Sequence, residues 1–148
     1  MKKQLGVVGM GVMGRSLARN WAKSGHTLAL YNRSVKGSEE GVALALTQQY
    51  QELRQAAAYE DLAAFIASLE HPRKIVLMVT AGPAVDELIA ELLPLLQSGD
   101  LIIDAGNAHY LDSERRMSML NTHDVNMLGL GVSGGEQGAL EGASLMAG

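Results

Sequence analysis

A glycine-rich turn restricts the possible folds of this chain more than any other feature. It follows the short apolar residues 4–8 and precedes residues 15–22, which favour a helix. In a strand–turn–helix unit, Gly9 permits the tight turn, Gly11 lets the backbone approach a pyrophosphate, and Gly14 lets the helix pack closely on the strand. The helix N-terminus then directs its free N–H groups at the phosphates. The residues predicted to hold a dinucleotide are Gly9, Met10, Gly11, Val12, Met13 and Gly14.

The residues after the second expected strand, at 26–31, predict which dinucleotide binds. Asn32, Arg33 and Ser34 stand there. A site for NAD usually has an Asp or Glu about 20 residues beyond the glycines, which accepts a hydrogen bond from the ribose 2′-hydroxyl. Here Asn32 is neutral, so no carboxylate is expected to repel a 2′-phosphate, and the Arg33 guanidinium can pair with it. The alternative interpretation is that Arg33 is a solvated residue in a polar turn. The position of Arg33 directly after the second strand favours NADP as the cofactor instead.

Composition argues against several other classes of protein. A chain of 148 residues with 47% hydrophobic residues is typical of one soluble domain with a sizeable core. The net charge of −4 and the lack of a long basic run argue against a nucleic-acid partner. No cysteine is present, which excludes disulfides and thiolate metal sites and is compatible with the cytoplasm. No signal peptide or membrane span is expected, and the four histidines have no shared spacing that predicts a metal.

The rest of the chain is expected to alternate between helices and strands. Residues 74–79 form a continuous apolar run typical of a strand buried on both faces, and Leu101–Asp104 and residues 125–129 are expected to be strands. Helices are expected at residues 38–55, 61–69, 84–96 and 112–120. A short third strand within residues 51–58 is an open alternative, and Pro94 should shorten the third of these helices. The alternation predicts an α/β fold with a doubly wound, mainly parallel sheet and helices on both faces.

Four segments together resemble 6-phosphogluconate dehydrogenase, the decarboxylating enzyme of the pentose phosphate pathway. They are residues 9–14, 32–34, 104–107 and 131–140. The similarity covers the whole chain but only the family's N-terminal domain, so residues 1–148 are expected to form an NADP-binding Rossmann domain. The family's helical domain, with its catalytic lysine and glutamate, would lie beyond Gly148. No catalytic residue is identified within the chain.

The resemblance also implies roles for residues later in the sequence. Asn107 would lie between the cofactor and the sugar acid, contacting both. The loop beside the nicotinamide ribose would comprise Val79, Thr80 and Ala81, and the substrate-binding turn Ser133, Gly134 and Gly135. The implied reaction is the NADP-dependent oxidative decarboxylation of 6-phosphogluconate to ribulose 5-phosphate. The complete enzyme would be a cytoplasmic homodimer, whereas this piece is expected to be monomeric and inactive alone.

The sequence departs from the family pattern beside these sites. Thr80 stands where a lysine is common, Ala105 where a second glycine is usual, and Ala108 where a serine or threonine is usual. These differences bear on activity and substrate choice more than on the fold. The alternative functions are a 3-hydroxyacid dehydrogenase of the same superfamily, which shares the Rossmann unit and a Ser-Gly-Gly turn, and a non-catalytic NADP-binding module that uses the fold without turnover. Residues 129–142 include six glycines, so a mobile surface loop is the alternative to a substrate-binding turn in this segment. Residues 114–116 are expected to be an exposed helix face.

Overall fold

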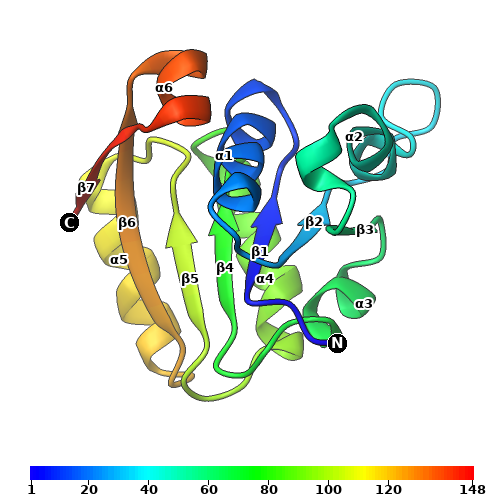
Figure 1. Ribbon diagram of the computed structural model, residues 1–148. Coiled ribbons are helices and arrows are strands. Elements are labelled where there is room, and N and C mark those ends of the chain that lie inside the picture. The colour runs from blue at the N-terminus through cyan, green and yellow to red at the C-terminus, as the bar shows by residue number, and fades with distance from the viewer.

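One sheet of seven strands forms the centre of the molecule, and helices cover both of its faces (Figure 1). The computed structural model describes residues 1–148. The strands are β1 (Leu5–Val8), β2 (Leu28–Tyr31), β3 (Ala57–Tyr59), β4 (Lys74–Leu77), β5 (Leu101–Asp104), β6 (Asn126–Ser133) and β7 (Ser144–Ala147). Their order is β3-β2-β1-β4-β5-β6-β7, and all neighbours are parallel except β6 and β7. The doubly wound, mainly parallel α/β fold is therefore confirmed.

Six α-helices and two short 3₁₀ helices connect the strands. They are α1 (Val12–Lys23), α2 (Val42–Gln49), η1 (Gln51–Leu53), α3 (Leu62–Ala67), α4 (Pro83–Leu92), η2 (Leu93–Leu95), α5 (Tyr110–Asn121) and α6 (Gly135–Glu141). Figure 1 shows α1 and α6 on one face of the sheet and α4 and α5 on the other. The Asn20 side chain joins α1 to α6 by donating to the Leu140 carbonyl at 2.9 Å. No helix is both long enough and apolar enough to span a bilayer.

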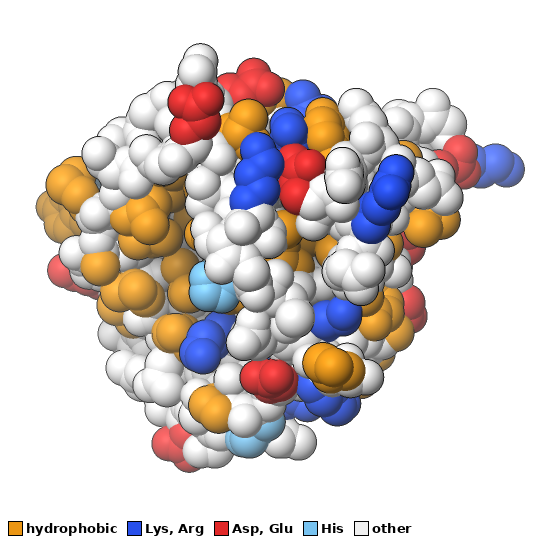
Figure 2. Space-filling model, in the orientation of Figure 1, with side chains coloured by type: hydrophobic (Ala, Val, Ile, Leu, Met, Phe, Trp, Pro, Cys, Tyr) orange, Lys and Arg blue, Asp and Glu red, His pale blue; other side chains and the backbone are white.

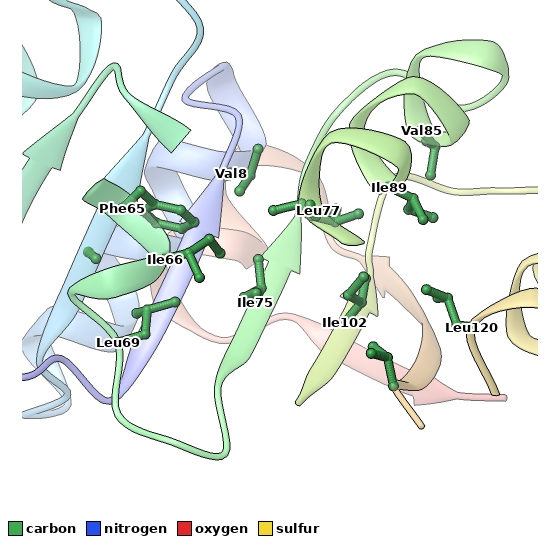
Figure 3. Packing of buried hydrophobic residues seen from close by; sticks show 13 residues of the cluster. Val8, Phe65, Ile66, Leu69, Ile75, Leu77, Val85, Ile89, Ile102 and Leu120 are labelled. Carbon is green, nitrogen blue, oxygen red and sulfur yellow. The ribbon is translucent and has the colours of Figure 1, made fainter. Parts of the chain in front are cut away.

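Successive residues of β1 enter different cores. Val7 is buried with Leu28 and Leu30 of β2, in a cluster that α1 and α2 complete. Val8 faces the opposite side and joins the larger cluster shown in Figure 3, where Leu77 of β4 lies near Ile89 of α4. Both faces of the central strands are thus covered by apolar side chains, as a doubly wound parallel sheet requires.

The connection order places a crevice at one edge of the sheet. β1 pairs with β2 on one side and with β4 on the other, so the chain crosses over β1 between β3 and β4. The strand order therefore reverses at β1 and β4. In open α/β sheets, ligands bind outside the carboxyl ends of the strands at such a reversal.

A buried carboxylate joins the starts of β4 and β5, at the edge of the sheet opposite the crevice. Asp100 precedes β5, is fully buried, and accepts hydrogen bonds from the N–H groups of Arg73 and Gln97 at 2.7 and 2.8 Å. The Arg73 guanidinium and the His71 Nδ1 each lie 3.0 Å from its oxygens. The start of β5 is thereby fixed to the start of β4, away from the crevice.

Several sequence expectations differ from the structure at element ends. The helix expected at 38–55 is interrupted: α2 ends at Gln49, η1 follows, and the open alternative of a third strand is confirmed as β3. Pro94 shortens α4 as expected, since the chain becomes 3₁₀ helix from Leu93. Residues 129–142 are not a loop but the end of β6 and all of α6, and β7 was not expected. In this segment glycines occupy the bends between elements, with positive φ at Gly134, Gly135 and Gly142.

Candidate cofactor-binding site

A cleft of about 340 Å³ occupies the crevice at the carboxyl ends of β1, β2 and β4. The first turns of α4 form its other wall through Ala84, Glu87 and Leu88. The predicted cofactor residues that line it are Gly9, Met10, Gly11, Asn32, Arg33, Val79 and Thr80. The predicted residues that do not line it are Val12, Met13, Gly14, Ser34, Ala81 and Asn107.

The three glycines of the turn meet different surroundings. Gly9 has φ +96°, and a Cβ there would lie 2.4 Å from the Met78 carbonyl oxygen. A Cβ on Gly14 would lie 1.8 Å from the Gly9 carbonyl oxygen, so no other residue fits without moving α1. A Cβ on Gly11 would meet no atom within 4 Å. Gly9 and Gly14 are therefore required by packing, whereas Gly11 leaves open space beside the cleft, as a bound pyrophosphate would require.

The N-terminus of α1 is suited to an anion. Gly11 caps the helix without a side-chain hydrogen bond, and no acidic residue lies in the first turn. The first bond along the helix runs from the Arg15 N–H to the Gly11 carbonyl, at 3.0 Å. The N–H groups of Val12, Met13 and Gly14 precede it and have no acceptor within the helix. Together with the helix dipole, they form a fitting site for phosphate oxygens.

Asn32 holds the glycine turn in place. The residue is 7% exposed, and its Oδ1 accepts a hydrogen bond from the Met10 N–H at 2.9 Å. Its Nδ2 donates to Glu39 Oε2 at 3.0 Å and to the Arg33 carbonyl at 3.1 Å. The sequence predicted Asn32 as a neutral neighbour of the ribose, and the structure adds that its amide joins two segments of the site.

Arg33 has a carboxylate partner that the sequence interpretation missed. Its Nη2 lies 3.3 Å from Glu39 Oε1, and its side chain is 73% exposed. The hydrogen bond from Asn32, reinforced by Arg33, lowers the pKa of Glu39 below its usual value, so the residue is charged at neutral pH. A carboxylate therefore lies beside Arg33, where the sequence interpretation expected none.

The reason is a reversal of the backbone after Arg33. The N–H of Val35 donates to the Glu39 carbonyl and the Glu39 N–H donates to the Val35 carbonyl, at 2.6 and 2.8 Å. Gly37, with φ +83°, permits the turn between them. Gly37 in a short polar segment was the only sequence signal for this turn.

The residues after β4, which the resemblance assigns to the nicotinamide ribose, form part of the wall of the cleft. The Met78 N–H donates to the Val8 carbonyl at 2.8 Å, which keeps this loop beside the end of β1. A Cβ on Gly106 would lie 2.3 Å from the Val79 carbonyl oxygen, so the loop after β5 packs directly on the loop after β4. Val79 and Thr80 therefore have fixed positions at the cleft.

The residues expected to meet the substrate lie on the same edge of the sheet but outside the cleft. Asn107 follows β5 with φ +64° and lines a second hollow of about 410 Å³ between α5, β6 and β7. Ser133, Gly134 and Gly135 form the exposed junction of β6 and α6. Because β5 and β6 are parallel, both groups lie at the carboxyl edge that carries the cleft, although the structure does not bring them into contact with it.

The second hollow adjoins an exposed apolar edge of the molecule. Met146 of β7 lines it and is 73% exposed, and Leu145 is 49% exposed. Figure 2 shows hydrophobic side chains gathered on this side, over β6 and β7. No group of three or more His, Asp or Glu side chains is placed to hold a metal ion.

Arg116 is buried, which corrects one part of the expectation of an exposed helix face at residues 114–116, whereas Glu114 and Arg115 are exposed as expected. It is 1% exposed; its Nε donates to Asp86 Oδ1 at 2.9 Å and its Nη2 donates to the Gly82 carbonyl at 3.0 Å. Its Nη1 lies 3.7 Å from Asp104 Oδ2, at the end of β5. Arg116 thereby fixes α5 to α4 and to the strand that precedes Asn107.

Comparison with known proteins identifies the family. A family model described as the NAD binding domain of 6-phosphogluconate dehydrogenase matches residues 4–148. The chain belongs to this family. A 6-phosphogluconate dehydrogenase from Bacillus licheniformis is 45% identical over 148 residues, which are 100% of this chain and 30% of that protein. An NAD(+)-dependent 6-phosphogluconate dehydrogenase from Bacillus subtilis has the same identity and coverage.

Solved structures agree with this family assignment. The 6-phosphogluconate dehydrogenase of Plasmodium falciparum, described in its apo form, with NADP+ and with 6-phosphogluconate, has a TM-score of 0.87 and 37% identity. The match covers 97% of this chain and 30% of that one. A 3-hydroxyisobutyrate dehydrogenase from Mycobacterium tuberculosis shares the fold, with a TM-score of 0.81 and 19% identity. The chain thus spans about 30% of the length of the family members that it matches.

Proposed function

We propose that this chain is the cofactor domain of an NADP-dependent enzyme that oxidatively decarboxylates 6-phosphogluconate to ribulose 5-phosphate. The observation that carries the proposal is the cleft, which places the open Gly11 and the Arg33 guanidinium at the carboxyl edge of the sheet. The bound dinucleotide would accept a hydride from C3 of the sugar acid. Membership of the family supports the choice of substrate.

Each part of the cleft has a proposed role toward the dinucleotide. The N–H groups of Val12, Met13 and Gly14 would bind the pyrophosphate, and Arg33 would pair with the 2′-phosphate. Val79 and Thr80 would contact the nicotinamide ribose. We assign no catalytic acid or base among the 148 residues. The support for these roles is the match between donor positions and the charges of the ligand.

The sugar acid would bind at the same edge of the sheet. Asn107 offers a donor and an acceptor, and Ser133 offers a hydroxyl to a substrate hydroxyl or carboxylate. We further propose a place in the pentose phosphate pathway, in the cytoplasm, within a homodimer of the complete enzyme. The lack of cysteine fits a reducing compartment.

The first test concerns Arg33. Arg33→Ala is expected to weaken NADPH binding about 10- to 150-fold, because a charge-assisted hydrogen bond contributes about 1.5–3 kcal/mol. NADH lacks the 2′-phosphate, so its affinity should change little. Titration calorimetry with both cofactors measures the difference. Arg54→Ala, which removes an exposed arginine outside the cleft, is the matched control. Equal losses for NADPH and NADH in Arg33→Ala would contradict the proposed preference.

The second test concerns the sugar acid. Ser133→Ala is expected to weaken 6-phosphogluconate binding to the NADP-saturated chain about 2- to 12-fold, the effect of one neutral hydrogen bond. NADP affinity should not change, because Ser133 lies outside the cleft. NMR titration of the amide signals measures both. Gly134 is unsuited to the test, since its φ of +117° would strain any side chain.

Ser118→Ala on the exposed surface of α5 is the control for the serine test. If Ser133→Ala binds 6-phosphogluconate as tightly as the unmodified chain, the β6–α6 junction has no role in substrate binding.

A further inference from the structure

Glu39 is held within the cofactor cleft by the fold. Its two carboxylate oxygens have different partners: Oε2 accepts from Asn32 Nδ2 at 3.0 Å, and Oε1 lies 3.3 Å from Arg33 Nη2. Its backbone is fixed by the pair of hydrogen bonds to Val35. Glu39 lines the cleft, and its side chain is half as exposed as that of Arg33, at 38% against 73%. The fold therefore holds the Glu39 carboxylate at a defined position in the cleft.

The charges around the cleft place Glu39 in competition with an anionic ligand. Arg33 is the only cationic residue that lines the cleft, whereas Glu39, Glu87 and Glu91 are anionic. Glu39 is also the only carboxylate that forms an ion pair with Arg33. A 2′-phosphate that binds Arg33 must therefore displace this carboxylate or lie beside it, and either arrangement costs free energy.

A ribose hydroxyl at the same place meets no such conflict. A carboxylate offers about four lone-pair positions and can keep its bonds to Asn32 and Arg33 while it accepts another from a hydroxyl. In NAD sites of this fold, an Asp or Glu after the second strand accepts a hydrogen bond from the 2′-hydroxyl. Here the position after β2 is Asn32, and the acceptor returns to the site from seven residues further along the chain.

We propose that Glu39 weakens the preference of this site for NADP, by competing with a 2′-phosphate for Arg33 and by accepting a hydrogen bond from the 2′-hydroxyl of NAD. The inference rests on the proposed function in one respect: the adenosine ribose must lie beside Arg33. The two residues then act in opposite directions. Arg33 favours the binding of NADP and Glu39 favours the binding of NAD. Their ion pair therefore reduces the difference in affinity between the two cofactors.

The test is Glu39→Gln, which removes the charge but keeps an oxygen that can accept from Asn32. The NADPH-to-NADH affinity ratio is expected to rise roughly 5-fold or more, the effect of one unit charge about 4 Å away in a water-like dielectric. Titration calorimetry at low ionic strength measures both cofactors. Glu40→Gln is the matched control, because it changes the net charge equally on an exposed neighbour outside the cleft.

The outcomes separate this inference from the proposed function. An unchanged ratio in Glu39→Gln, or equal losses for both cofactors, would overturn the role of Glu39, since a purely structural part affects both ligands alike. If Arg33→Ala selectively weakens NADPH while Glu39→Gln leaves the ratio unchanged, only the inference on Glu39 is wrong. If Arg33→Ala has no selective effect but Glu39→Gln raises the ratio, the carboxylate acts on the phosphate directly and the role of Arg33 is wrong.

Discussion

Gly14→Ala is expected to destabilise the chain and to weaken NADPH binding about 100-fold or more. The new Cβ would lie 1.8 Å from the Gly9 carbonyl oxygen, so α1 has to move away from the glycine turn. Overpacking of this kind costs about 1–3 kcal/mol of the free energy of unfolding, and here the obstacle is backbone. The displaced helix N-terminus loses its bonds to the pyrophosphate, and two charge-assisted bonds at about 1.5 kcal/mol each account for the affinity loss.

Gly11→Ala is the matched control for this prediction. Its Cβ meets no protein atom within 4 Å, and its backbone angles, φ −67° and ψ −171°, suit any residue. The free energy of unfolding should therefore be unchanged or rise slightly. Affinity for NADPH should fall, because the methyl group enters the space beside the cleft. Urea unfolding and titration calorimetry separate the two effects. A Gly14→Ala chain as stable as the unmodified chain would contradict the packing argument.

Asp100→Ala is expected to lower the free energy of unfolding by roughly 3–5 kcal/mol, the usual effect of removing one partner from a buried ion pair. Asp100 is fully buried, and the Arg73 side chain, 13% exposed, would lose its partner. Two backbone N–H groups would also lose their acceptor. Asp112→Ala removes an exposed partner of Arg115 and should cost less than about 1 kcal/mol. Urea unfolding at pH 7 compares the two. A loss as small as that of the control would show that the network at Asp100 contributes little.

The same carboxylate predicts how stability depends on pH. Burial alone would raise the pKa of Asp100, but the Arg73 and Gln97 N–H groups and the Arg73 guanidinium outweigh it, so the pKa is lowered in the folded chain. A lowered pKa stabilises the fold above the unfolded value, about 3.9, and this contribution is lost as pH falls through the folded value. The free energy of unfolding should fall more steeply below about pH 4 in the unmodified chain than in Asp100→Ala.

The glycine turn could be predicted because its constraints are local. Gly9 and Gly14 stand at fixed positions between a strand and a helix, and each is required by backbone atoms close in sequence or directly after the adjoining strand β4. The same holds for β4, whose apolar run predicted a strand buried on both faces, and for α3, a predicted helix whose N-terminus the Asp61 side chain caps. These features supplied most of the fold and the position of the cleft.

Glu39 and Arg116 could not be predicted, since their environments depend on partners that sequence patterns do not connect. Glu39 reaches Asn32 because the backbone reverses at Gly37, in a polar segment without periodicity. Arg116 is buried because Asp86, thirty residues earlier, lies opposite it. Charged residues are normally exposed, so Arg116 was assigned to an exposed helix face and Glu39 gave no signal of its own.

Asn32 makes the two ends of the cofactor site mechanically dependent on each other. One amide group holds the Met10 N–H of the glycine turn and the Glu39 carboxylate, on the side where we propose that the ribose binds. Any ligand group that moves Glu39 therefore changes the support of the turn beneath the pyrophosphate. Contributions measured separately for the adenosine half and the phosphate half of a dinucleotide should not add, because groups that share a hydrogen-bond partner are energetically coupled. Discrimination between a 2′-phosphate and a 2′-hydroxyl then also changes the affinity of the site for the rest of the dinucleotide.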